Sequence, residues 1–469
     1  MKREKELVTN SIIIAIGNLS IKLVSFFLLP LYTSILSTTD YGLFDLLITI
    51  STFLLPFITL LMEESMFRFL IDCKTEDDKK EIISITVSFA LKSSLIFMLL
   101  FFLVGFIIEI PYKVLFLMYI LSQIFTSLKN AVVRGMGKIK IYSISNFASS
   151  ALVIILNIFF IAYLNFGITG MLLANIIASF SVSICIFLIV NMWKYISFKK
   201  LNKIKRKEMI KYSIPLVPNS LSWAIINLSD RIVVSSFLGV ESNGIYSVSY
   251  KFPNIMNTFY GFFYTSWKEN AAKTIGDKDV NDYYNNIYKA IKRFMWTIVV
   301  GMISILPLVY GVLIKKDFIQ SYDYVPILLI SIYFSNISGF YGGIFSAYKN
   351  TKIMGTTTIL GALINIIVDI LLIKYVGIWA AAISTLVSCI IVYLYRWFKL
   401  KKYIKLKEEI RVYLFSIISL VISLISFYLK NNIINIIVLI FIAVFGVYIN
   451  YDVIKVITKK IKNKRNKKN

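Results

Sequence analysis

Several ionisable residues lie within long apolar stretches of this 469-residue chain, and their chemistry could serve a function. They are four cations and two carboxylates, namely Lys22, Lys92, Arg231, Lys251, Asp45 and Asp369. A charged side chain at membrane depth costs about 2.5–3.5 kcal/mol on insertion scales, so it usually has a function or a charged partner. The cations could contact an anionic ligand, and Asp45 or Asp369 could bind Na⁺ or a proton. The alternatives are ion pairs with Asp45, Asp230 or Asp369, and snorkelling of long side chains to the interface.

Other kinds of site chemistry are poorly represented. Histidine is absent, which excludes His-ligated zinc and His-based acid–base catalysis. Cys73, Cys185 and Cys389 are far apart and form neither a disulfide framework nor a CxxC motif. The longest expected external loop, near 314–322, leaves no room for a catalytic domain. We therefore expect no enzyme activity, no metal and no cofactor, and a coupling ion (H⁺ or Na⁺) stays open.

Long apolar segments must position these charges. Apolar residues make up 58% of the chain and the mean hydropathy is +0.76, whereas soluble domains are about 45–50% apolar. A hydrocarbon core of about 30 Å needs about 20 helical residues. We predict an all-α polytopic membrane protein with about 14 transmembrane helices, near 11–34, 41–66, 82–108, 112–133, 143–164, 168–192, 212–237, 244–267, 290–313, 323–347, 354–375, 377–398, 411–429 and 432–452.

The distribution of Lys and Arg predicts the orientation. The net charge is +26, but the cations lie in short segments between apolar runs, which argues against nucleic-acid binding. The densest segments are 194–211, 396–411 and 455–468. Cytoplasmic loops are enriched in Lys and Arg, so we predict that both termini lie in the cytoplasm of a multi-pass inner-membrane protein. These segments would also contact anionic membrane lipids.

Two landmarks recur in the sequence and indicate a tandem repeat. Leu36–Phe44 (LSTTDYGLF) is similar to Leu238–Tyr246 (LGVESNGIY), and Phe166–Gly170 (FGITG) is similar to Val376–Ala380 (VGIWA). A six-span unit enters the membrane twice from the same side, which is a parallel repeat of the kind found in transporters. We therefore predict bundles at 1–192 and 212–398, joined by a basic cytoplasmic linker at 193–211 and followed by two further helices (399–452) and a basic cytoplasmic tail (453–469).

An ordered set of short motifs resembles the polysaccharide-transporter family of the multidrug/oligosaccharidyl-lipid/polysaccharide exporter superfamily. The set is Leu29-Pro30-Leu31-Tyr32, Asp40-Tyr41-Gly42-Leu43-Phe44, Arg134-Gly135-Met136-Gly137-Lys138, Asp230-Arg231, Gly244-Ile245-Tyr246-Ser247, and the turns at Gly167 and Gly377. It extends from Asn10 to Lys399, which is most of the chain.

The resemblance implies a V-shaped pair of six-helix bundles that alternate between inward-open and outward-open states. Its implied substrate is a polyprenyl-diphosphate-linked oligosaccharide repeat unit, flipped outward for O-antigen or capsule synthesis. Lys22, Arg231, Lys251 and Lys92 would then contact the diphosphate, because a multiply anionic group in a low-dielectric cleft needs cations. We expect a monomer that works beside other polysaccharide-assembly proteins. A cation-coupled multidrug antiporter of the same superfamily is the alternative.

Overall fold

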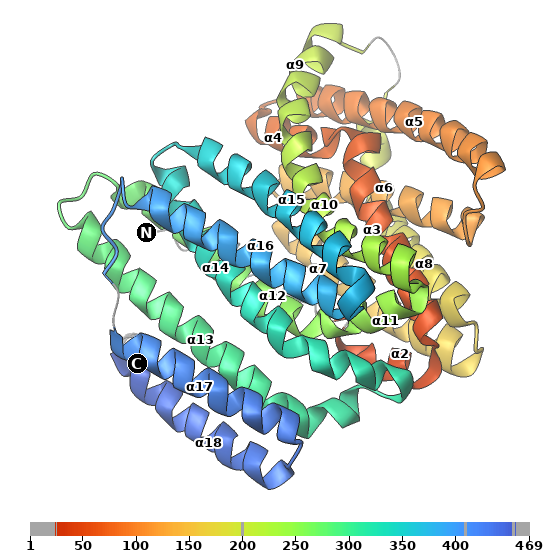
Figure 1. Ribbon diagram of the computed structural model, residues 1–469. Helices are drawn as coiled ribbons and strands as arrows, with labels where there is room; N and C mark the ends of the chain where they lie inside the picture. The colour runs from red at the N-terminus through yellow and green to blue at the C-terminus, as the bar shows by residue number, and fades with distance from the viewer. Residues whose placement is uncertain (1–23, 25, 198–200, 408–409, 453–454, 456–469) are drawn as a thin grey trace, which may run out of the picture. The chain divides into compact units, whose positions relative to one another are not determined.

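The computed structural model describes residues 24, 26–197, 201–407, 410–452 and 455. Within these residues the chain forms helices and no strand, which confirms the predicted all-α class (Figure 1). Polar side chains cap the starts of several helices. The hydroxyls of Ser37 and Thr75 accept hydrogen bonds from the backbone amides of Asp40 and Asp78, at 3.0 and 3.1 Å. Such caps satisfy backbone donors that a helix start leaves free.

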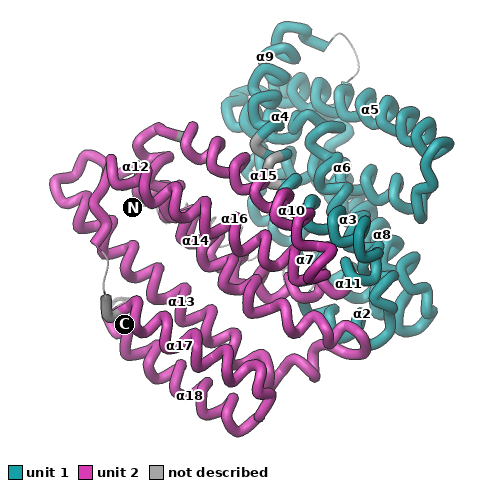
Figure 2. Tube along the Cα trace, in the orientation of Figure 1, with its two compact units in different colours: residues 1–244 teal, residues 245–469 magenta. Residues whose placement is uncertain are grey.

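The chain divides into two compact units, residues 1–244 and 245–469 (Figure 2). The helices of unit 1 are α2 (Leu29–Ile35), α3 (Thr38–Thr59), α4 (Met62–Asp72), α5 (Glu76–Ile107), α6 (Lys113–Gly135), α7 (Ile139–Asn157) with its π-helical extension η1 (Ile158–Tyr163), α8 (Gly167–Ile189), η2 (Met192–Tyr195), α9 (Lys203–Ser213), η3 (Ile214–Leu216) and α10 (Val217–Leu238). Helix α11 (Val240–Ser249) crosses the division.

The helices of unit 2 are α12 (Lys251–Thr274), α13 (Val280–Leu313), η4 (Lys316–Tyr324), α14 (Val325–Ala347), α15 (Thr351–Val376), α16 (Trp379–Leu400), α17 (Ile410–Leu429) and α18 (Asn432–Ile449). Helix α16 packs against α14 and α15, and α12 packs against α14. The last pair, α17 and α18, lies along α13 (Figure 1). Two side-chain contacts hold α17 in place. Trp296 on α13 donates to the Ser419 hydroxyl at 3.2 Å, and the rings of Tyr322 on η4 and Phe427 stack with their centroids 3.9 Å apart.

Eleven helical segments of the described residues are long and apolar enough to cross a membrane. They are Thr38–Thr59, Glu76–Ile107, Lys113–Gly135, Ile139–Tyr163, Gly167–Ile189, Val280–Leu313, Lys316–Ala347, Lys352–Val376, Trp379–Leu400, Val412–Leu429 and Asn432–Ile449. The first expected span, 11–34, lies mostly outside the described residues, and α10 and α12 are not among the eleven segments. The chain is therefore a multi-pass membrane protein, and the count of about 14 spans stays a prediction.

Two predicted boundaries differ from the structure in an informative way. The second span was expected to run to 66, but α3 ends at Thr59 and α4 begins at Met62. Leu60 and Leu61 between them both have left-handed backbone conformations, with φ of 47° and 53°. The eighth span was expected to begin at 244, but α11 is a separate helix and α12 begins at Lys251. The apolar run of α3 continues through Leu60, Leu61 and Met62, so hydropathy alone does not mark the first break.

The predicted basic linker is a structured segment of unit 1. Residues 203–213 form α9, which packs against α4. The Lys205 ammonium lies 3.1 Å from a Glu81 carboxylate oxygen and 3.6 Å from one of Asp78, and both acids are at the start of α5. Tyr195 donates its phenol to Glu76 at 2.7 Å. These contacts dock the linker on α5.

Candidate functional site

A buried ion pair joins the first part of the chain to α10. The Arg231 Nε–H donates to a carboxylate oxygen of Asp45 at 2.7 Å, and the two side chains are 10% and 13% exposed. Asp45 lies on α3, which packs against α10. Arg231 therefore forms one of the ion pairs that the sequence analysis gave as an alternative. The anion-binding role of Arg231 stays a prediction.

The repeated glycine motifs meet one turn away from this pair. A Cβ on Gly42 would overlap the carbonyl oxygen of Val240, and a Cβ on Gly244 would overlap that of Thr38. Asn243, beside the second glycine, donates its amide to the Gly42 carbonyl at 2.8 Å. Only residues without a side chain permit two backbones to approach so closely. The two copies of the motif therefore form one contact between α3 and α11.

Asp369 occupies a polar position in the interior of unit 2. It is fully buried on α15, one turn after Asn365. The Asn365 amide donates to Ser384 on α16 at 3.2 Å and lies 3.5 Å from the Thr385 hydroxyl. A carboxylate, an amide and two hydroxyls supply the oxygen ligands that hard cations prefer. No cluster of three or more acidic or cysteine side chains with metal-binding geometry occurs in the described ranges.

The other predicted cations have different surroundings. Lys22 lies outside the described residues. Lys92 is exposed on α5, among apolar side chains that are also exposed, such as Leu95 and Leu99. Lys251 is half-buried and begins α12 in unit 2. Among the predicted site residues that the structure describes, Asp45 and Arg231 are joined by an ion pair.

Sequence reasoning missed three buried cations, because charges near a predicted span end were assigned to the adjoining loop. They are Lys129 on α6, Lys292 on α13 and Arg396 on α16, with exposures of 2%, 7% and 6%. Lys129 contacts the Ser145 hydroxyl at 3.3 Å. One signal was available: serines and asparagines recur near these positions in the apolar stretches, which is typical of polar interior faces of membrane helices.

Arg396 connects three helices of unit 2. Its Nε–H donates to Thr357 on α15 at 2.9 Å, and an Nη1–H donates to the Ser338 carbonyl on α14 at 3.1 Å. Its Nη2 group lies 3.3 Å from the Met354 carbonyl. A planar guanidinium can satisfy several carbonyl and hydroxyl groups at once, which lysine cannot. Arg396 is therefore a cross-link within the bundle.

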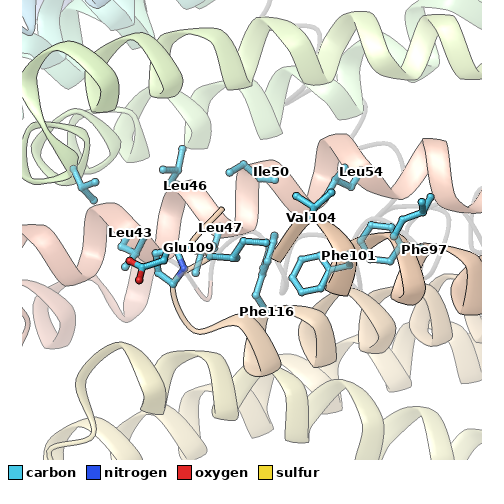
Figure 3. A pocket seen from close by; sticks show the side chains of 14 residues that line it. Leu43, Leu46, Leu47, Ile50, Leu54, Phe97, Phe101, Val104, Glu109 and Phe116 are labelled. Atoms are coloured by element: carbon cyan, nitrogen blue, oxygen red, sulfur yellow. The ribbon is translucent and has the colours of Figure 1, made fainter. Parts of the chain in front are cut away.

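An apolar pocket of about 600 Å³ lies between α3 and α5 in unit 1 (Figure 3). Leucines of α3 (Leu43, Leu47 and Leu54) and aromatic residues of α5 and α6 (Phe97, Phe101 and Phe116) line it. Glu109 is the one charged residue of the lining. Such a lining suits a hydrocarbon chain and not a charged or sugar group.

Comparisons with known proteins bear on this arrangement. A family model described as "Polysaccharide biosynthesis protein" matches residues 7–267. The solved structure of the lipid II flippase MurJ in an inward closed conformation is 20% identical with a TM-score of 0.69, covering 96% of this chain and 98% of that one. An inward-facing multidrug resistance MATE family transporter is 13% identical with a TM-score of 0.62, covering 83% and 98%. A search of curated proteins gave no match.

A third similar structure is a transporter from Pyrococcus furiosus that is described as having a binding pocket of reversed polarity. It is 17% identical with a TM-score of 0.54, covering 84% of this chain and 95% of that one. The fold is therefore that of the multidrug/oligosaccharidyl-lipid/polysaccharide exporter superfamily of membrane transporters. The family model covers more than half of the chain, and the chain belongs to the polysaccharide biosynthesis protein family.

Proposed function

We propose that this protein is a flippase that moves a polyprenyl-diphosphate-linked oligosaccharide repeat unit from the cytoplasmic to the outer face of the inner membrane. The repeat unit would then enter a surface polysaccharide such as O-antigen or capsule. The family match over residues 7–267 carries this proposal. The likeness to a lipid II flippase over nearly the whole chain supports it, because that protein's named substrate is also a lipid. The apolar α3–α5 pocket is compatible with a lipid chain.

The embedded cations would contact the diphosphate. Arg231 suits phosphate oxygens because its planar fork can donate two parallel hydrogen bonds. In the present structure its Nε–H donates to Asp45, which fixes the orientation of the guanidinium. We propose that Arg231, Lys22, Lys251 and Lys92 contact the diphosphate. Asp45 would fix the orientation of the Arg231 side chain.

A cation gradient could drive the transport cycle, with Asp369 or Asp45 as the coupling carboxylate. Asp369 has the more suitable surroundings, because Asn365 and hydroxyls of α16 lie beside it in a buried region. Asp45 is neutralised by Arg231, which favours a positioning role. The proposal therefore ranks Asp369 first for Na⁺ or H⁺ coupling.

A multidrug antiporter is the second candidate, and the likeness to MATE transporters favours it. A drug antiporter selects organic cations and therefore needs an anionic cavity. Buried cations of the described chain include Lys129, Arg231 and Arg396, against the buried acids Asp230 and Asp369. This balance supports an anionic cargo.

A deletion strain tests the proposal directly. We expect lipid-linked repeat units to accumulate on the cytoplasmic side, with loss of surface polysaccharide and recovery on complementation. The double variant Asp45→Asn/Arg231→Gln, which removes both charges of the pair, should reduce surface polysaccharide at unchanged protein level. Arg206→Gln, which changes an exposed cation of α9, should not reduce it. Normal surface polysaccharide in the deletion strain, together with increased sensitivity to organic cations, would support the antiporter instead.

A further inference from the structure

The break between α3 and α4 places a carboxylate in an unusual environment. Leu60 and Leu61 adopt left-handed backbone conformations in succession, with φ of 47° and 53°. Side chains other than glycine rarely adopt this conformation, and two adjacent leucines in it mark a strained junction. Helix α4 resumes at Met62, so that Glu63 follows the break directly. Broken helices in transporters commonly carry ion or substrate sites, because the break frees polar backbone and side-chain groups.

Thr59 and Glu63 form a small polar group across this break. The Thr59 hydroxyl oxygen lies 3.1 Å from the Leu55 carbonyl and 3.2 Å from a Glu63 carboxyl oxygen, Oε1. It also accepts the Leu61 amide at 3.2 Å. A hydroxyl has a single hydrogen, so it cannot donate to the carbonyl and to the carboxyl at once. If Thr59 donates to Leu55, a proton on Glu63 Oε1 supplies the missing hydrogen of the second contact.

The other carboxyl oxygen has no such partner. Glu63 Oε2 is shielded from solvent and accepts no hydrogen bond from any described residue. An ionised carboxylate with one oxygen in this state is disfavoured, because both oxygens need donors or water when charged. A neutral carboxyl group tolerates this position better.

The surrounding charges do not compensate for a negative Glu63. Helix α4 packs against α5, α6 and α9, whose buried or half-buried cations are engaged elsewhere. Two of these cations form ion pairs: Lys79 with Glu76, and Lys205 with Asp78 and Glu81. Two others donate to polar groups: Lys129 to the Ser145 hydroxyl and Lys113 to the Gly105 carbonyl. The Arg134 guanidinium lies over the rings of Phe67 and Tyr142. On α4 itself, Arg68 pairs with Asp72. The remaining cations of these helices, Lys80, Lys92, Lys203, Arg206, Lys207 and Lys211, are exposed, as are the acids Glu64, Asp77 and Glu208.

Burial raises the pKa of the Glu63 carboxyl, and the neighbouring charge of Glu64 raises it further. Hydrogen bonds from its own backbone amide and from Thr59 oppose this shift and lower the pKa. Helix α4 carries the exposed charged residues Glu64, Arg68 and Asp72, so water and protons can reach the side where α3 ends.

We propose that Glu63 is a proton-binding site: the carboxyl is protonated while the α3–α4 break has the geometry seen here, and it releases its proton when a change at the break gives the carboxylate access to water or a cation. Protonation is then coupled to the conformation of the break, since each state binds the proton with different affinity. The role of this proton in transport rests on the proposed flippase function. The proton site itself does not.

Infrared spectroscopy of the purified full-length protein in lipid nanodiscs tests the site without transport. We expect a carbonyl-stretch band of a protonated carboxylic acid to persist above the pH range in which glutamate side chains usually ionise. Glu63→Gln should remove this band, and Glu64→Gln, which changes the exposed neighbour, should retain it. Thr59→Val should keep the band and shift its frequency, because the carboxyl loses its hydroxyl partner.

Two results would overturn the proposal: no protonated carboxyl in the wild type above the usual range, or a band of unchanged intensity in Glu63→Gln. If Glu63→Gln does not fold, Thr59→Val supplies the test, since an unchanged band frequency places the proton elsewhere. A parallel flipping assay in liposomes separates the two proposals. If the wild-type protein shows the Glu63 band but does not flip the lipid, the flippase function alone is refuted. If it flips the lipid but lacks the band, the proton site alone is refuted.

Discussion

The Arg231 guanidinium donates to Asp45 at 2.7 Å, and this pair connects α3, which contains most of the first copy of the repeated motif, with α10, which precedes the second copy. Both side chains are largely shielded from solvent. The pair explains why two opposite charges persist in apolar helices: each supplies the partner that the other would lack. Their separate substitutions therefore have different consequences from their joint removal.

Asp45→Asn or Arg231→Gln alone should lower the free energy of unfolding by about 3 kcal/mol, because each leaves one buried charge without its partner. The double variant should recover much of this loss. The thermal unfolding midpoint in detergent measures both effects. If Arg231 contacts the diphosphate, the double variant folds normally but exports little surface polysaccharide. Full export by the double variant would limit the pair to a structural role.

Gly42→Ala and Gly244→Ala should each reduce the amount of folded protein severely, because the added Cβ would overlap backbone carbonyl oxygens that cannot move aside. Overpacking of this kind costs about 1–3 kcal/mol or more. Gly261→Ala is the matched control, since no atom lies near its added Cβ and alanine favours a helix by about 0.5–1 kcal/mol. Equal yields for all three variants, measured by size-exclusion chromatography, would contradict the close approach of α3 and α11.

Lys129→Met should keep or raise stability, by up to about 1–4 kcal/mol, because it replaces a buried ammonium that contacts a serine with an apolar side chain of similar size. Lys80→Met on the exposed face of α5 should change stability by less than about 0.5 kcal/mol. Chemical unfolding of both variants measures the difference. A strongly destabilised Lys129→Met protein would show that the ammonium has compensating interactions.

The pH dependence of stability should report Glu63. Its pKa is raised in the folded protein, so the unfolded chain loses this proton first as the pH rises. Stability is therefore unaffected below the ordinary pKa of about 4.3 and falls with rising pH until the folded-state pKa is passed. Thermal unfolding midpoints should decline less over this interval for Glu63→Gln than for Glu64→Gln or the wild type. Parallel curves for all three would contradict the raised pKa.

Much of the fold could be predicted from composition and periodic patterns. Long apolar runs predicted the membrane helices, and the short Gly-containing motifs predicted turns such as those at Gly167 and Gly377, which both have positive φ values of 53° and 59°. The break at Leu60 and Leu61 could not be predicted, because leucine favours continued helix and the polar residues Glu63 and Glu64 come only after it. Local sequence does not encode a left-handed leucine pair, which tertiary packing imposes.

The candidate site was predicted in part. The sequence identified Asp45 and Arg231 as embedded charges, but which charges pair depends on how distant helices cross. Lys129 and Arg396 were missed because they lie close to helix ends, where a charge normally reaches water. Their burial results from contacts with neighbouring helices: Lys129 contacts Ser145 on α7, and Arg396 contacts α14 and α15. Side-chain environment, unlike span number, is a three-dimensional property.

Reconstituted flipping tests the central claim most directly. The purified protein would be placed in liposomes that carry a fluorescent polyprenyl-diphosphate oligosaccharide, and the fraction accessible to a membrane-impermeant reagent would be followed in time. We predict that the protein raises this fraction from about half to nearly all of the lipid, and that Arg231→Gln slows the rise at least tenfold. A fraction that stays at its protein-free value under H⁺ and Na⁺ gradients of either direction, while an organic cation dye is transported, would contradict the account.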